Sequence, residues 1–99
     1  MEITIKDKTY KVKYSLRALF IYEQIKKEPF ALKTITDYYL FFYCMLLASD
    51  SSSELTFDDF IDTLDEHPEI GTEMMNYLNK ENQKNAVFED EKKKVMETI

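Results

Sequence analysis

An uncharged, aromatic segment in the middle of the chain constrains the fold more than any other feature. The eleven residues 38–48 carry no charge and include five aromatic side chains. A helix that is apolar on all sides has to be covered on all sides, because it has no polar stripe to face water. A chain of 99 residues that is 44% hydrophobic has just enough apolar material to cover one such helix. We therefore expect this segment to form the central helix of a single domain.

The net charge of −6 is distributed unevenly along the chain. Residues 1–33 carry eight basic and four acidic groups (+4), residues 34–78 carry ten acids and no Lys or Arg (−10), and residues 79–99 carry five of each (0). Phosphate contacts need Lys and Arg, so the acidic middle argues against nucleic acid as a partner. The charged N-terminus lacks the apolar run of a secretory signal, and residues 38–48 are too few to span a bilayer, so we expect a cytoplasmic protein without a membrane contact.

Local patterns predict an N-terminal β-hairpin followed by helices. Residues 2–14 alternate between apolar and polar side chains around a polar turn, which is typical of two short strands. Ser15, Thr34 and Thr56 each precede a helical pattern and are good N-caps. The helices are expected at about 15–27, 34–48, 57–66 and 69–79. On the first of them, the side chains expected on or near the buried side are Leu16, Leu19, Phe20 and Ile25, and Ile21 and Tyr22 widen this apolar side.

The predicted fold class is α+β and mostly α, with the N-terminal β-hairpin packed on a bundle of about four helices. Residues 1–78 are expected to form one globular domain. Polar residues dominate from Asn79 onward. We therefore expect residues 79–99 to form a C-terminal tail that is either mobile or helical.

No group of residues has the spacing of a catalytic, cofactor or metal site. Cys44 and His67 are the only cysteine and the only histidine, whereas a zinc site needs four ligands. Cys44 lies within the apolar segment, where the simpler interpretation is a small buried hydrophobe in a reducing compartment. The single glycine, Gly71, excludes a glycine-rich phosphate loop. We therefore predict a protein that is not an enzyme and has no catalytic, cofactor-binding or metal-binding residues.

Several sequence blocks follow one another in a set order between residues 2 and 70. A hairpin with a lysine-rich second strand leads into residues 13–25, read as KYSLRALFIYEQI, which are followed by Pro29-Phe30; the aromatic helix and residues 55–62, LTFDDFID, come next. This order resembles the tail assembly chaperones of long-tailed bacteriophages. The resemblance implies a small helical protein of the host bacterial cytoplasm that binds the tape-measure protein, and tail-tube subunits, during tail morphogenesis and is absent from the mature virion.

A chaperone for a long helical protein needs apolar grooves with polar rims. The aromatic helix offers anchors for such a partner, because tyrosine gives a large contact area at a low entropic cost. The acids on the outer face of the 57–66 helix offer a surface for a basic partner. Ordinary core packing and an ordinary solvated face are the alternative interpretations. The partner-binding residues predicted on this basis are Tyr38, Tyr39, Phe42, Tyr43, Asp58, Asp62 and Asp65.

Two other functions are compatible with the same sequence. The acidic middle also suits a regulatory module of the antirepressor type, because spaced carboxylates can imitate phosphates. A structural tail component that stays in the particle is the third hypothesis. A small domain with this much aromatic surface can also cover it by pairing with a second copy, and the sequence does not choose between a monomer, a dimer and a ring.

Overall fold

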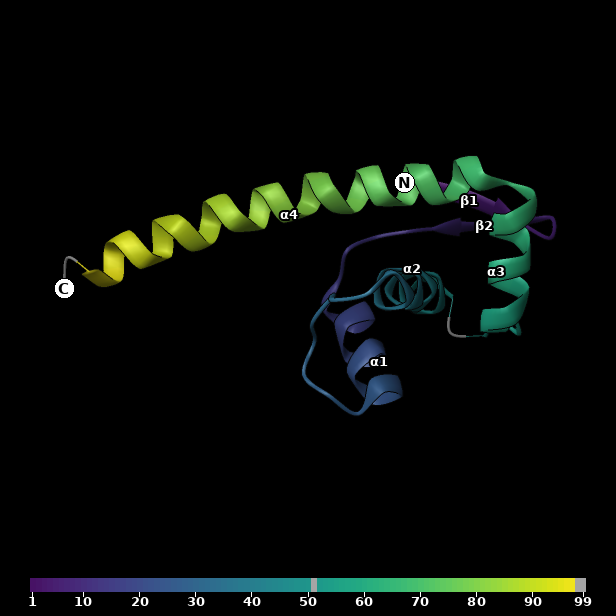
Figure 1. Ribbon diagram of the computed structural model, residues 1–99, viewed down its shortest axis with the longest axis horizontal. Helices are drawn as coiled ribbons and strands as arrows, with labels where there is room; N and C mark the ends of the chain where they lie inside the picture. Colours follow the sequence, from purple (N-terminus) through teal and green to yellow (C-terminus); the bar gives the residue numbers. More distant parts are fainter. Residues whose placement is uncertain (51, 98–99) are drawn as a thin grey trace.

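A computed structural model describes residues 1–50 and 52–97, with side chains as far as Asn82. The elements, in chain order, are β1 (Glu2–Ile5), β2 (Lys8–Lys11), α1 (Leu16–Lys26), α2 (Ile35–Ser49), α3 (Phe57–Glu66) and α4 (Pro68–Glu97) (Figure 1). The expected α+β, mostly α class with an N-terminal hairpin on helices is confirmed.

The last helix is longer than the sequence patterns indicated. We expected a helix at about 69–79 followed by a tail that is mobile or helical, and α4 continues through both without a break to Glu97. Lys and Glu, which are frequent after residue 79, are good helix formers, so a polar segment can extend a helix that the domain has already started. Figure 1 shows this second half of α4 extending away from the other elements. The side chains after Asn82 and residues 98 and 99, which include the expected apolar face of the tail, lie outside the described part.

The two strands pair in antiparallel register, with Glu2 opposite Lys11 and Ile5 opposite Lys8. The turn residues Lys6 and Asp7 both have positive φ angles, 50° and 64°, which is the backbone that a two-residue hairpin turn needs. The side chains that alternate toward the helices are buried, as predicted. They are Ile3, Ile5, Tyr10 and Val12.

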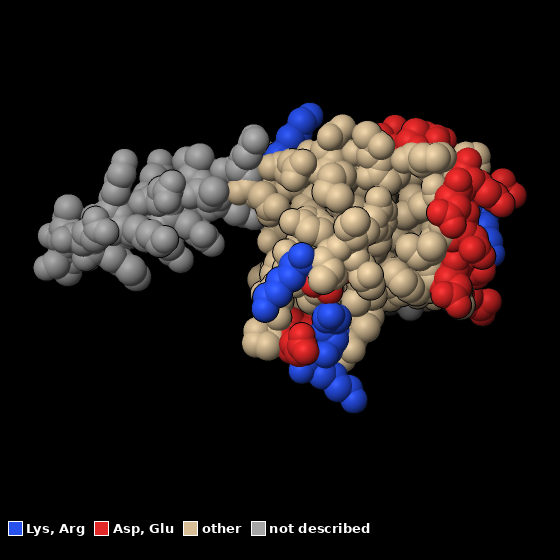
Figure 2. All heavy atoms as spheres, in the orientation of Figure 1, with Lys and Arg blue, Asp and Glu red and all other residues tan. Residues whose placement is uncertain are grey.

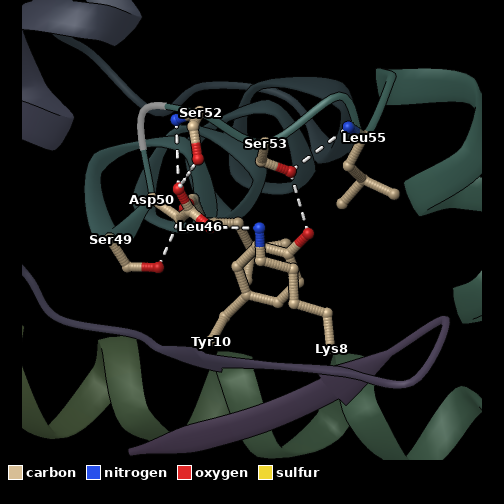
Figure 3. Close-up of polar contacts among 8 residues, drawn as sticks. All are labelled: Lys8, Tyr10, Leu46, Ser49, Asp50, Ser52, Ser53 and Leu55. Carbon is tan, nitrogen blue, oxygen red and sulfur yellow. Dashed lines mark hydrogen bonds and ion pairs between the residues drawn. The ribbon is translucent and has the colours of Figure 1, made fainter.

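The hairpin lies between α4 on one side and α2 on the other (Figures 1 and 3). The backbone N–H of Tyr14, just after β2, donates to the hydroxyl of Tyr77 on α4 at 3.0 Å. A two-stranded hairpin is marginal on its own in water, so this double coverage accounts for its formation here. The first strands of the chain therefore depend on its last helix.

The central helix α2 is at least partly covered on all sides from Asp37 to Ala48, in line with its composition. From Asp37 to Ala48 no residue is in the exposed class, and Figure 1 shows the helix end-on with α1, the hairpin and α3 around it. Its fully buried side chains include Phe41, Phe42 and Cys44. Burial raises the pKa of the Cys44 thiol to about 12, so the side chain stays protonated and behaves as a small hydrophobe.

The start of α2 is fixed by the predicted capping box. Thr34 accepts a hydrogen bond from the backbone N–H of Asp37, and the Asp37 carboxylate accepts one from the backbone N–H of Thr34. Asp37 is 6% exposed, and it is the one charged residue that is buried in the part of the chain whose side chains are described. Hydrogen bonds from the Lys26 ammonium and from the backbone N–H of Lys33 hold its pKa well below the usual range. The charge is thus buried together with its partners.

Helix α1 faces α2 with a different side from the one that we predicted. Leu16, Phe20 and Ile25 were expected on the buried side, but they are 69%, 57% and 47% exposed, and Leu19 is only half-buried. The buried residues of α1 are Ala18 and Tyr22. Small Ala18 allows the two helices to approach closely, and the Tyr22 ring packs edge-on against Phe41, with centroids 6.1 Å apart, while its hydroxyl donates to the Ala31 carbonyl at 2.9 Å. Burying the Tyr22 ring, with its hydroxyl hydrogen-bonded, is therefore favoured over burying the apolar side chains on the opposite side of α1.

Polar contacts fasten β2 to the segment between α2 and α3 (Figure 3). The Lys8 ammonium pairs with the Asp50 carboxylate, and the Tyr10 hydroxyl lies 2.8 Å from the Ser53 hydroxyl. Asp50 also accepts hydrogen bonds from the backbone N–H and the hydroxyl of Ser52. Because this segment leads directly into α3, these contacts set where α3 begins relative to the hairpin.

Candidate partner-binding site

A groove of about 630 Å³ lies between α3 and α4. Both helices contribute side chains at helical spacing, one or two turns apart along the edge that faces the other helix. Tyr39 reaches the groove from α2. The lining residues are Tyr39, Ile61, Leu64, Asp65, Pro68, Gly71, Thr72, Met75 and Asn76.

The groove lies at the corner where the chain turns from α3 into α4 at Pro68 (Figure 1). Thr56 caps the start of α3 by accepting from the backbone N–H of Asp59, and α3 ends at Glu66. Pro68 then begins α4, where its missing N–H costs nothing and its fixed φ suits a helix. The two helices therefore diverge from a tight corner. Ile61 and Met75 remain half-buried along their facing edges, so part of their apolar surface stays open.

Gly71 forms the floor of the groove together with Tyr39. A Cβ placed on Gly71 would lie 3.5 Å from Cε1 and from Oη of Tyr39, which is ordinary van der Waals contact. The φ angle of Gly71 is not positive. Neither lack of room nor backbone conformation therefore requires glycine at this position, although glycine inside a helix costs about 1 kcal/mol relative to alanine. Its structural effect is to leave a gap of methyl size beside the Tyr39 ring.

The acidic side chains on α3 divide between different surroundings. Figure 2 shows them gathered on the face of the molecule that α3 forms. Asp65 lines the α3–α4 groove, whereas Asp62 lines a separate hollow beside the hairpin. Asp58 is exposed in the first turn of the helix. Asp59 pairs with the Lys6 ammonium at 3.3 Å, and this contact lowers the pKa of its carboxyl group.

The three predicted acids differ from Asp59 in making no ion pair among the described side chains, although Lys6 lines the same hollow as Asp62. Within the described side chains, no Lys or Arg lies within ion-pair distance of Asp58, Asp62 or Asp65.

The predicted aromatic anchors are mostly committed to the fold. Phe42 is fully buried, so its predicted role as a surface anchor is wrong. Tyr43 is half-buried, donates its hydroxyl to the Leu55 carbonyl and packs edge-on against Phe57, with centroids 5.6 Å apart. Tyr38 is half-buried outside the lining of the groove. Tyr39 is the anchor that the groove exposes, and its other edge packs on Phe42 at 5.5 Å.

The structure thus brings together two of the seven predicted partner-binding residues, Tyr39 and Asp65. Ile61 and Leu64 were not among the predicted partner-binding residues, and Gly71 was used only to exclude a phosphate loop. The signal that could have found the groove is the pair of helically spaced series on either side of Pro68, since such series mark two helix edges that meet at a corner.

Among the residues that the structure describes, no three His, Cys, Asp or Glu side chains form a group that could hold a metal ion. His67, at the corner between α3 and α4, is exposed, and its Nδ1 atom lies 3.3 Å from the Glu69 carboxylate. In the described part of the chain, every helix falls short of the combined length and apolarity that crossing a membrane demands.

Comparisons with known proteins found no match for this chain among models of protein families, curated proteins or solved structures.

Proposed function

We propose that the protein is a tail assembly chaperone of a long-tailed bacteriophage that binds the tape-measure protein during tail morphogenesis. The observation that carries this proposal is the open α3–α4 groove, whose apolar walls have an acidic residue at the rim. The order of sequence blocks between residues 2 and 70 supports it independently, because those blocks resemble this family. The protein acts in the host bacterial cytoplasm, without catalysis, and leaves before the virion is complete.

The groove suits the tape-measure protein because that partner is a long helical rod. Before the tail tube surrounds it, such a rod exposes stripes of apolar side chains to water. An apolar groove between two helices is a common way to hold an amphipathic helix. Binding would cover the stripe and prevent aggregation until the tube assembles.

The exposed side of α1 is a second surface in this proposal. Leu16 and Phe20 are one helical turn apart, so they lie on the same side of α1, and both are more than half exposed. We assign this surface to tail-tube subunits. Self-association through the same side chains is the alternative, and sedimentation of the purified protein with and without a Phe20→Ser change distinguishes the two.

Co-expression with the neighbouring phage proteins tests the proposal. The tagged chaperone should retain the tape-measure protein on an affinity column, and the two should elute together in size-exclusion chromatography. Mass spectrometry of purified virions should find the tape-measure protein without the chaperone. A chain that is found in virions at a fixed ratio to the tail proteins would instead be a structural tail component.

A second candidate function is favoured by the free carboxylates of Asp58, Asp62 and Asp65. As an acidic regulatory module, the protein would bind a basic protein in place of nucleic acid. Its binding would then weaken steeply with salt, and the triple change to Asn would abolish it. Binding to the tape-measure protein, with apolar contacts at its centre, should survive moderate salt.

A further inference from the structure

We propose that the α3–α4 groove binds one amphipathic α-helix in a fixed orientation, with an apolar side chain of that helix over Gly71 and basic side chains beside Asp65. This inference rests on the proposed function for the identity of the partner. The fit and the orientation of the bound helix follow from the shape, the floor and the charge of the groove.

The shape of the groove matches a third helix. Its walls are two helix edges, and side chains at such edges form ridges with grooves between them into which another helix packs. On α4 the lining extends from Pro68 to Asn76, which spans about 12 Å at the rise of an α-helix. A partner helix of about three turns therefore covers the whole groove.

The floor sets where the deepest side chain of the partner lies. Gly71 has no side chain, so the Tyr39 ring is reached through the gap beside it. Leu64 and Met75 border this gap from the two walls. The terminal methyl group of a Leu or Met side chain in the partner would fit this gap and contact the Tyr39 ring, which favours apolar and sulfur-containing groups.

The lining sets the orientation of the partner, because Asp65, on the α3 side, is the charged residue among the side chains that line the groove. The α4 side of the rim is formed by the uncharged Thr72 and Asn76. A bound helix therefore places Lys or Arg side chains toward α3 and neutral polar side chains toward α4.

The test uses a designed 18-residue helical peptide and the full-length, isotopically labelled protein. The peptide has a Leu stripe at helical spacing with Lys on one flank only, and a matched peptide has Glu in place of each Lys. Gly71 is the only glycine, so its amide gives an isolated nuclear magnetic resonance signal. We expect the Lys peptide to shift the signals of Gly71, Ile61 and Met75, and the Glu peptide to bind at least about tenfold more weakly. Shifts confined to other surfaces, or equal binding of both peptides, would overturn the proposal.

Two variants and one control locate the contacts. Gly71→Ala puts a methyl group into the gap and should weaken binding of the Lys peptide about fivefold while leaving the protein folded. Asp65→Lys should weaken binding about tenfold at low salt. Asp62→Lys makes the same charge change on the same helix outside the groove and should have little effect. If Asp62→Lys weakens binding as much as Asp65→Lys, the peptide responds to the net charge of the protein, and the assigned contact between Asp65 and its basic side chains is wrong. If Gly71→Ala binds the Lys peptide as tightly as the wild type does, the gap beside Gly71 is not the site of the apolar side chain.

Capture of the full-length tape-measure protein separates this inference from the proposed function. If the tape-measure protein binds the wild-type chain and binds the Gly71→Ala and Asp65→Lys variants equally well, the function stands and the groove is not its site. If the Lys peptide binds in the groove and the tape-measure protein does not bind at all, the groove stands and the proposed function is overturned.

Discussion

The Lys26 ammonium lies 3.0 Å from the Asp37 carboxylate and joins the last turn of α1 to the first turn of α2. The same carboxylate accepts hydrogen bonds from the backbone of Lys33 and Thr34. One buried acid therefore caps the central helix and holds its neighbour in place. The exposed apolar side of α1 depends on this contact, because it helps to set the rotation of α1 against α2.

Removing the reciprocal cap should destabilise the domain. Thr34→Ala deletes the hydroxyl that accepts from the Asp37 backbone N–H, and we expect the free energy of unfolding in urea to fall by about 1 kcal/mol. Thr36→Ala is the matched control, since Thr36 is exposed within the first turn of the same helix. Equal losses for both variants would show that the cap contributes nothing specific.

Stability should fall in acid through the contacts of Asp50. The hydrogen bonds from Lys8 and Ser52 lower the pKa of Asp50 from 3.8 to about 2. A carboxyl group with a lowered folded pKa stabilises the fold above its unfolded pKa, and this contribution disappears as the pH falls through the folded value. Urea unfolding should therefore show that the free energy of unfolding falls between about pH 5 and pH 2, and that it falls less in Asp50→Asn.

The partner of Asp50 provides the check. Lys8→Gln should flatten the acid dependence in part, because the Ser52 hydrogen bonds to Asp50 remain, and it should add nothing further in the Asp50→Asn background, where the ion pair is already removed. Independent, additive effects of the two changes would contradict the assignment of the pair.

Much of the fold could be predicted because its signals are local. Alternation marked the hairpin, Ser15, Thr34 and Thr56 marked three helix starts, and an uncharged run marked the central helix. The rotation of α1 could not be predicted, because α1 has apolar side chains on every side and the covered side depends on what Tyr22 contacts. The groove was missed for a related reason. It belongs to no single helix and appears where the edges of α3 and α4 meet at Pro68.

The end of α1 offers a stabilising change. Lys27 is the C-cap residue and has a φ angle of 57°, in the left-handed region that favours glycine. Lys27→Gly should raise the free energy of unfolding by about 1 kcal/mol, because it removes the clash of Cβ with the backbone. Glu28→Gly is the control at the next position, where φ is not positive, and it should destabilise slightly. A loss of stability in Lys27→Gly would show that its side chain has a role that the cap geometry does not explain.

The corrected orientation of α1 can be tested by substitution. Phe20 is 57% exposed, so Phe20→Ser should change the free energy of unfolding by less than about 0.5 kcal/mol. Phe41 is fully buried against Tyr14, Tyr22 and Phe30, and Phe41→Ala should cost about 3–5 kcal/mol. Thermal and urea unfolding of both variants measure the contrast. A large loss in Phe20→Ser would restore the orientation that the sequence pattern indicated.

The position of the hairpin between α2 and α4 has a consequence for synthesis on the ribosome. The strands are synthesised first. The hydrogen bond from the Tyr14 backbone N–H to the Tyr77 hydroxyl cannot form until Tyr77, sixty-three residues later, has left the ribosome. Until α4 has left the ribosome, one face of the hairpin remains uncovered. The domain should therefore gain its cooperative structure only late in translation, and truncation before Tyr77 should yield a protease-sensitive product in place of a smaller stable one.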